Sequence, residues 1–370
     1  MIGILNAKSA KFLIDFPTIV ATIILVIFGL IMIYDASIVA AHKDFGDKLY
    51  YFKNQLVWAS LGTIALVVLS LIDYHKLIKY GPILFVAALF LLIIVLIPQI
   101  GTKIYGARRW INLAGFNFQP SEFAKIALIF YGTYILAKFQ KFNIRLFDIL
   151  YVLFLPTAIA TILVLLEPDL GSSLIFVAIS LGTYFAAGGP TWHFLLMVPT
   201  VLGASIVAVI TQPYRLARLK SFFDPNFDPQ GASYQINQII TAVASGGLLG
   251  VGIGSSRGKF DFIPEVQSDA IFAVVAEEFG FIGSIVLIGL LLFLITRALT
   301  IASRARDFEG KILAIGLTIL IASQALLNLG SIVVLIPLTG IPLPFISYGG
   351  SSLLVMMSAI GILISIKRLS

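Results

Sequence analysis

Charged side chains lie at the edges of long apolar runs in this sequence, where they could act on an anionic substrate. Arg109 and Trp110 precede one run, and Arg215 and Arg218 follow another. A guanidinium group has the planar geometry to bind a pyrophosphate through paired hydrogen bonds. The alternative for the first pair is an interfacial belt, in which Trp110 lies at the headgroup level and the arginine contacts lipid phosphate.

Acidic residues also border or enter the apolar runs. Glu122 and Lys125 are three residues apart, on one face of a helix that is predicted to begin near Pro120. They either form a structural ion pair or line a polar cavity. Asp169 and Asp269 each precede a run, where a carboxylate can cap a helix N-terminus. Glu277 and Glu278 follow Asp269 deeper in the same run. Because charges inside apolar spans are costly, these groups indicate a functional cavity.

The composition determines which elements must position these groups. Hydrophobic residues make up 59% of the 370 residues and charged residues 12%, against about 25% charged in soluble domains. Apolar runs near 20 residues, without alternation, predict transmembrane helices and exclude a barrel. The sequence therefore predicts an all-α integral membrane protein, a single domain over 1–370, of about ten transmembrane helices: 16–36, 54–72, 80–98, 120–138, 147–166, 171–188, 191–211, 269–296, 312–337 and 350–366.

The distribution of basic residues predicts the topology. Six lie in the short loops of one side: Lys43, Lys48, Lys53, Lys103, Arg108 and Arg109. Thirteen lie on the other: Lys8, Lys11, Lys76, Lys79, Lys138, Lys141, Arg145, Arg297, Arg304, Arg306, Lys311, Lys367 and Arg368. The positive-inside rule therefore predicts that both termini are cytoplasmic. It also predicts that the long loop 212–268, between spans seven and eight, is extracytoplasmic, with an amphipathic helix near Tyr234–Val243 against the bilayer.

Other site classes have little support in the sequence. Cysteine is absent, which excludes disulfides, thiolate metal sites and a cysteine nucleophile. The three histidines are scattered without metal-ligand spacing. The sequence has a net charge of +7, but it has no basic runs or aromatic platforms of the kind that bind nucleic acid, so no nucleic-acid partner is expected. We assign the basic residues to setting the membrane topology and to contacts with lipid headgroups.

The ordered motifs give a family resemblance along the whole chain. The sequence resembles the shape, elongation, division and sporulation (SEDS) proteins, whose members include FtsW and RodA. The resemblance rests on Gly106–Trp110, Gln119–Lys125, Pro168–Gly171, Arg215 and Arg218, Pro264–Glu265 with Asp269, Glu277–Gly280 and Gly340–Ser351. Gly252–Ser255 followed by Lys259 is most like the division branch, FtsW. Gln267–Ser268 stand where the family usually has His-Thr.

The resemblance implies a peptidoglycan glycosyltransferase that polymerises lipid II at the outer face of the cytoplasmic membrane. Asp269 is then the candidate base for the attacking sugar hydroxyl. The candidate substrate-binding residues are Arg109, Trp110, Glu122, Lys125, Arg215, Arg218, Ser347 and Tyr348. The implied partners are lipid II, membrane lipid and a class B penicillin-binding protein transpeptidase. No cofactor is assigned, and a divalent cation (Mg²⁺ or Mn²⁺) remains an option.

Two rival functions remain open from the residues alone. A lipid II flippase would need a polar path through the whole membrane, and Glu277, Glu278, Gln324 and Asn328 keep this alternative open. A non-catalytic scaffold for division partners would tolerate the change Asp269→Ala. Neither rival explains the crowding of charges at the outer span ends as well as polymerisation does.

Overall fold

A computed structural model describes most of the chain, namely residues 15–104, 107–113, 116–140, 145–229, 231–256, 258 and 264–370. Several residues that the sequence analysis uses lie outside these ranges. They are the basic residues Lys8, Lys11 and Lys141, and the motif residues Gly106 and Lys259.

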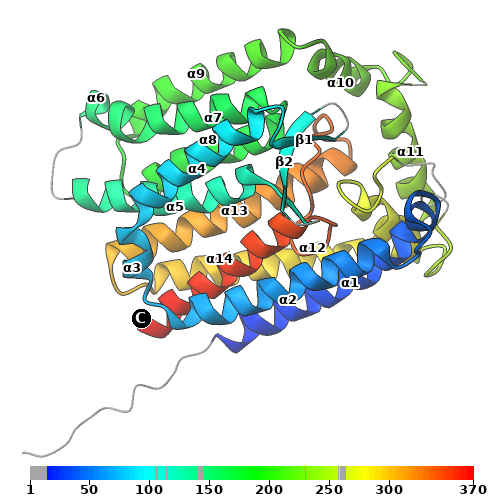
Figure 1. Cartoon of the computed structure of the whole chain (residues 1–370), viewed down its shortest axis with the longest axis horizontal. Coiled ribbons are helices and arrows are strands. Elements are labelled where there is room, and N and C mark those ends of the chain that lie inside the picture. Colours follow the sequence, from blue (N-terminus) through cyan, green and yellow to red (C-terminus); the bar gives the residue numbers. More distant parts are fainter. Residues whose placement is uncertain are drawn as a thin grey trace, which may run out of the picture.

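The structure is a bundle of long helices, as predicted (Figure 1). In the described part of the chain, seven helical stretches have the length and apolarity to cross a membrane, and two further apolar helices, α4 and α8, are shorter. Each of the ten predicted ranges contains a helix, while their number as membrane spans stays a prediction. The helices are α1 (Phe16–Phe45), α2 (Tyr50–Leu71), α4 (Gly81–Leu96), α5 (Pro120–Phe139), α6, η1 and α7 together (Leu146–Leu166), α8 (Leu170–Ala186), α9 (Thr191–Ile210), α12 (Ile271–Ser303), α13 (Phe308–Ile332) and α14 (Gly350–Leu369). A short helix, α3 (Tyr74–Lys79), joins α2 to α4.

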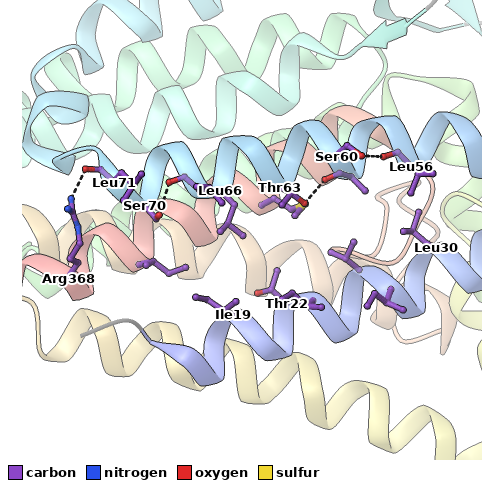
Figure 2. Close-up of a pocket in the computed structure, with 17 residues that line it drawn as sticks. Ile19, Thr22, Leu30, Leu56, Ser60, Thr63, Leu66, Ser70, Leu71 and Arg368 are labelled. Atoms are coloured by element: carbon purple, nitrogen blue, oxygen red, sulfur yellow. Dashed lines mark hydrogen bonds between the residues drawn. The ribbon is translucent and has the colours of Figure 1, made fainter. Parts of the chain in front are cut away.

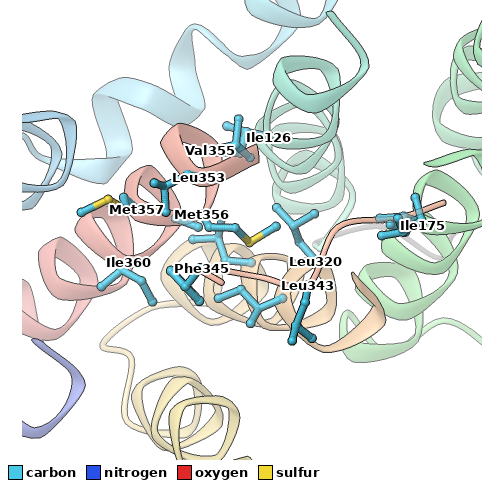
Figure 3. Close-up of a cluster of buried hydrophobic side chains, with 14 of the residues drawn as sticks. Ile126, Ile175, Leu320, Leu343, Phe345, Leu353, Val355, Met356, Met357 and Ile360 are labelled. Carbon is cyan, nitrogen blue, oxygen red and sulfur yellow. The ribbon is translucent and has the colours of Figure 1, made fainter. Parts of the chain in front are cut away.

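The apolar core lies where α5, α8, α13 and α14 meet the segment 333–349. Figure 3 shows Ile126 of α5, Ile175 of α8 and Leu320 of α13 around Leu343, Phe345 and the α14 side chains. The share of residues buried inside the protein is 72% in the most apolar window of α14 and 11% in that of α9. Helix α14 is therefore largely enclosed by the bundle, whereas α9 is peripheral.

The connection between α4 and α5 forms a small sheet that the sequence analysis did not predict. Strands β1 (Gly101–Ile104), β2 (Ala107–Leu113) and β3 (Phe116–Phe118) pair antiparallel in that order. Thr102 lies opposite Trp110, and Lys103 lies opposite Arg108, with an irregularity between the two pairs. The sheet gives Arg109 and Trp110 fixed positions at the end of the bundle.

The predicted amphipathic helix in the long loop is present as α11 (Ala232–Ser245). Its Ile236 and Ile239 are buried, and the helix packs on α12, so part of its apolar face meets protein and not the bilayer. A second helix, α10 (Pro213–Phe223), carries Arg215 and Arg218. Pro213 in its first turn suits a helix start, because proline has no N–H to leave unpaired there.

A break in α12 is filled by a glycine-rich segment from the long loop. Gly280 has a left-handed φ of 65° inside the helix. Residues 246–252 fold against this break: Phe281 and Ile282 donate their N–H groups to Gly247 and Leu248, at 2.9 and 3.2 Å. Val251 and Gly252 donate in turn to the carbonyls of Glu277 and Glu278, at 3.0 and 3.1 Å. Backbone groups that the break frees thus find partners, as apolar surroundings require.

The two ends of the bundle carry different residues. The end with the sheet, α10 and α11 also holds the first residues of α5, α8, α12 and α14. The opposite end holds α3 and the C-terminus (Figure 1). The described residues assigned to inner and outer loops therefore separate to opposite ends of the bundle.

Candidate active site

Asp269 and Arg218 approach each other beside Gly340. Gly340 has a φ of +68°, and a side-chain carbon added to it would lie 3.7 Å from Asp269 Oδ2 and 3.9 Å from Arg218 Nη1. Nη1 of Arg218 also donates to the carbonyl of Leu338 at 3.0 Å. The positive φ favours glycine at this position, and the carboxylate and the guanidinium, from two distant segments, lie on either side of it.

Asn328 of α13 holds the backbone on both sides of this contact. Its Nδ2 atom donates to the carbonyl of Asp269 at 2.7 Å and to that of Ile341 at 2.8 Å. Asn328 is fully buried, and so is Gln324 one turn earlier, which donates to the carbonyl of Pro342 at 3.2 Å. These two amides, considered above as parts of a transport path, fix the loops that carry Asp269 and Gly340.

Asp269 lies just before α12, whose N-cap residue is Ala270. The side chain is partly exposed, yet its Oδ1 atom is buried and has no hydrogen-bond partner among the described residues. Burial raises the pKa of Asp269 above its usual 3.8, and the nearby charge of Arg218 acts in the opposite direction. A carboxylate oxygen without a partner is available to accept a proton or a hydrogen bond from a substrate.

Glu265 is a second carboxylate at this site, and the sequence analysis did not single it out as a site residue. Burial is the largest cause that raises the pKa of Glu265, and the negative charge of Asp269 raises it further. The charges of Arg109 and Arg218 lower it. Its φ of +49° is unusual for a residue other than glycine, and strain of this kind is frequent at functional sites. Glu265 Oε2 accepts from the hydroxyl of Ser268 at 3.2 Å. Its place four residues before Asp269 was the only signal in the sequence.

A cavity of about 360 Å³ opens beside Arg218. It is lined by α10 and α11 and by Pro264 and Leu338, and Tyr214 and Tyr234 supply aromatic surface. The guanidinium of Arg218 stacks over the Tyr214 ring at 4.5 Å. Arg218 thus lines the cavity and also approaches Asp269. The size is that of pockets that bind small polar or sugar-like groups.

Arg109 and Arg215 both donate hydrogen bonds to backbone carbonyls at the C-terminal end of α7. Arg109 Nε donates to the carbonyl of Glu167 at 2.9 Å, and its Nη2 donates to that of Pro168. Arg215 donates to the carbonyls of Leu165 and Ala208, at 2.9 and 3.0 Å, and its buried Nε has no partner among the described residues. Free carbonyls at a helix C-terminus attract cations, which accounts for these contacts.

Glu167 is fully buried next to these arginines, and neither of its carboxyl oxygens has a hydrogen-bond partner among the described residues. Burial raises its pKa to about 9, Asp169 adds to the rise, and Arg109 opposes it. Asp169 is committed to capping α8, because its Oδ1 accepts from the N–H of Ser172 at 2.9 Å. The raised pKa favours the neutral, protonated form of Glu167.

Glu122 and Lys125 form an ion pair inside the bundle. Lys125 Nζ lies 2.6 Å from Glu122 Oε1 and 3.4 Å from Gln324 Oε1, and both charged side chains are fully buried. Gln324 in turn donates from Nε2 to the hydroxyl oxygen of Ser352 at 2.8 Å. The pair explains why α5 is stable as a buried helix despite two charges near its start, since each charge is compensated by the other.

The remaining candidate residues occupy the rim of the same end. Ser347 accepts from the N–H of Leu343 through its hydroxyl at 2.8 Å and so stabilises the loop before α14. The N–H of Tyr348 donates to the carbonyl of Gln267 at 2.9 Å, which ties that loop to the segment of Asp269. Trp110 lies partly exposed on β2. These three residues lie at the same end of the bundle as Asp269.

The donor set does not match a protein-held metal. Among the residues that the structure describes, no group of three or more His, Cys, Asp or Glu side chains could hold a metal ion. The two carboxylates of the site are Glu265 and Asp269, and they are accompanied by arginines. A divalent cation would have to draw most of its ligands from the substrate or water.

The sequence over residues 17–370 matches the model of one protein family, described as cell cycle proteins and named for FtsW, RodA and SpoVE. The chain belongs to the FtsW/RodA/SpoVE family. The match covers nearly the whole chain, so it includes both the bundle and the segment that carries Arg218 and Asp269.

Curated members of the FtsW/RodA/SpoVE family are similar over almost their full lengths. Stage V sporulation protein E of Bacillus subtilis is 40% identical over 357 residues, covering 96% of this chain and 97% of the relative. The probable peptidoglycan glycosyltransferase FtsW of Trichlorobacter lovleyi is 41% identical over 355 residues, covering 95% of this chain and 93% of the relative.

Solved structures of the family share the fold. A structure of a peptidoglycan synthase complex contains a chain with 28% identity and a TM-score of 0.79, covering 96% of this chain and 98% of its own. The rod shape determining protein RodA of Thermus thermophilus has 26% identity and a TM-score of 0.70, with coverage of 97% and 98%. The membrane-embedded helical architecture is therefore that of this family.

Proposed function

We propose that the chain is a peptidoglycan glycosyltransferase that polymerises lipid II, with Asp269 as its general base. The observation that carries the assignment of the site is that Asp269 and Arg218 lie beside a cavity, with Asp269 Oδ1 buried and without a hydrogen-bond partner among the described residues. Proton removal from a sugar hydroxyl needs a carboxylate, and a departing pyrophosphate needs cations. The relatives named as glycosyltransferases support the reaction class.

The reaction transfers a growing glycan from its undecaprenyl pyrophosphate to the 4-hydroxyl of an incoming lipid II. The hydroxyl oxygen attacks the anomeric carbon, its proton passes to Asp269, and the bond to the pyrophosphate oxygen breaks with its electron pair. Attack from the opposite face converts an α linkage into a β-1,4 bond. A partly buried Asp269 is a stronger base than a solvated one, because burial destabilises its charged form.

Cations around the site stabilise the leaving group in this proposal. Arg218 lines the cavity and contributes one guanidinium directly. Arg109 is near enough to influence the pKa of Glu265, although two of its donors already bind the carbonyls that end α7. Arg215 and the Lys125–Glu122 pair keep the surrounding helix ends in place, so their proposed contribution is to positioning.

The site faces the outside of a bacterial cytoplasmic membrane in this proposal, with both termini cytoplasmic. The distribution of basic residues supports that orientation, because Lys76, Lys79, Arg304, Arg306 and Lys311 lie at the end opposite Asp269. The lipid tail of the substrate can then remain in the bilayer while the sugars enter from the outer leaflet.

A class B penicillin-binding protein, the transpeptidase that crosslinks the product, is the proposed partner. The similarity to a chain in a structure of a peptidoglycan synthase complex supports this assignment. Coupling the two enzymes would deliver new strands directly to the crosslinking site.

The test is polymerisation of purified lipid II by the full chain, with and without the transpeptidase partner. Wild type, Asp269→Asn and Glu309→Gln would be compared at equal thermal stability in detergent. Glu309→Gln removes a carboxylate at the opposite end of the bundle and serves as the matched control. We expect glycan strands from wild type and the control, and a rate at least about 10²-fold lower from Asp269→Asn.

Two results would contradict the proposal. Polymerisation by Asp269→Asn at the wild-type rate would remove the base assignment and leave Asp269 a structural residue. Failure of wild type to polymerise with its partner, while it moves lipid II across vesicles, would favour the flippase. The internal polar groups argue against that rival, since Gln324 and Asn328 are bonded to backbone carbonyls.

A further inference from the structure

A groove of about 520 Å³ runs along the lipid-facing side of α1, α2 and α14, away from the site of Asp269. Figure 2 shows its two limits: Arg368 beside Leu71 at one end, and Leu30 and Leu56 at the other. From Leu56 to Leu71 the groove follows α2 for about 22 Å, which exceeds half of the ~30 Å hydrocarbon core. A single extended hydrocarbon chain fits this length.

The wall of the groove is apolar although it contains hydroxyl groups. Each of these hydroxyls donates to a carbonyl of its own helix at 2.7–2.9 Å: Thr22, Ser60, Thr63 and Ser70. Their hydrogen-bonding capacity is thus directed into the helices, and aliphatic side chains provide most of the remaining surface. Such a wall suits an acyl chain and offers little to a polar substrate.

Arg368 supplies charge at one end only. It is the one charged residue among the described residues that line the groove. Its Nη2 atom donates to the carbonyl of Leu71 at 2.7 Å, and its Nε atom is buried without a partner in the described part of the chain. Among the described residues, no ion pair involves Arg368.

We propose that this groove binds one anionic glycerophospholipid, with an acyl chain along α1 and α2 and its phosphate at Arg368. The leaflet is the one at the end of the bundle that carries the C-terminus. A guanidinium with unused donors binds a phosphate oxygen through charge-assisted hydrogen bonds. Capping of the α2 C-terminus by Arg368 uses a single donor and is compatible with this contact.

The experiment measures lipid binding to the detergent-solubilised full chain by native mass spectrometry. Apparent Kd values are measured for phosphatidylglycerol and for phosphatidylcholine with identical acyl chains. The Kd for phosphatidylcholine divided by the Kd for phosphatidylglycerol defines the anionic preference. Arg368→Gln removes the phosphate contact, and Lys367→Gln removes the same charge one residue away, outside the groove. Thr63→Phe fills the groove without changing charge.

The proposal predicts that wild type and Lys367→Gln share the preference for phosphatidylglycerol. In Arg368→Gln this preference for phosphatidylglycerol should fall about tenfold, since one charge-assisted hydrogen bond contributes about that factor in Kd. Thr63→Phe should weaken binding of the first molecule of either lipid. A ratio unchanged in Arg368→Gln, an equal loss in Lys367→Gln, or wild-type affinity in Thr63→Phe would each overturn the proposal. If Arg368→Gln does not fold, Arg368→Met, which also removes the charge, and Thr63→Phe carry the same test.

Discussion

Arg218 of α10 and Asp269, fifty-one residues later, both lie within 4 Å of one point, the position that a side-chain carbon on Gly340 would occupy. Three segments that are remote in sequence therefore meet at a single carboxylate. The arrangement makes the charge of Asp269 depend on Arg218, because a nearby cation stabilises the ionised form.

Removal of that cation should change the pH dependence of polymerisation. Without Arg218 the pKa of Asp269 rises further above 3.8, so the base becomes protonated at a higher pH. In Arg218→Gln the acidic limb of the pH–rate profile, normalised to its maximum, should move to higher pH. Lys220→Gln, on the same helix, is the matched control. A limb at the wild-type pH in Arg218→Gln would show that Asp269 is not the group titrating in that limb.

The buried pair on α5 should show strong coupling in stability. Lys125→Met leaves Glu122 buried without compensation and should destabilise the protein by about 3–5 kcal/mol. The double change Glu122→Gln with Lys125→Met should recover part of the loss. Thermal unfolding in detergent measures both, with the exposed Lys138 on the same helix as the control site. Additive effects of the two single changes would contradict a coupled pair.

Gly280 should be intolerant of any side chain. A Cβ there would lie 2.3 Å from the backbone nitrogen of Gly250, and the φ of +65° costs an L-residue about 1–2 kcal/mol by itself. Gly280→Ala should therefore lower the unfolding temperature markedly. Gly289→Ala, in the same helix with nothing within 4 Å of the added carbon, should be neutral or stabilising. Similar effects at the two positions would contradict the pairing of 246–252 with the break.

The end of the bundle opposite the site contains a pH-dependent contact. His75 lies between Asp73 and Asp307, with Nδ1 2.7 Å and Nε2 3.1 Å from their oxygens, and these carboxylates raise its pKa against the effect of burial. Because the folded pKa is above 6.5, the stabilisation is complete below pH 6.5 and is lost as pH rises through the folded value. The unfolding temperature of wild type, measured against pH, should therefore fall as pH rises through the folded pKa of His75. His75→Gln should remove this fall, and His42→Gln should retain it.

Apolar run length predicted the helices well, because membrane spans need continuous hydrophobicity and little else. The run at 120–138 was the weakest, since its two charges are neutralised only by each other, within the fold. The sheet at 101–118 was missed because its strands have at most seven residues and give no clear alternation. The break at Gly280 could not be predicted, because its partners lie about thirty residues upstream.

For the candidate site, sequence reasoning found the residue types but not their separation into groups. Asp269 and Arg218 lie together beside Gly340, whereas Arg109 and Arg215 donate to carbonyls at the end of α7, and Lys125 is buried with Glu122. A one-dimensional pattern cannot distinguish a guanidinium that faces a cavity from one that caps a helix. Glu265 was passed over as a site residue because its motif did not reveal its electrostatic link to Asp269.

The repair of α12 by residues 246–252 has a consequence for biosynthesis. A helix with a break at Gly280 exposes unpaired backbone groups if it enters lipid alone, which is unfavourable. Its partner segment precedes it in the chain, so ribosomal synthesis releases the partner first. The partner segment is therefore already synthesised when the broken span follows it. A circular permutant that places 246–252 after α12 would reverse this order and should insert poorly.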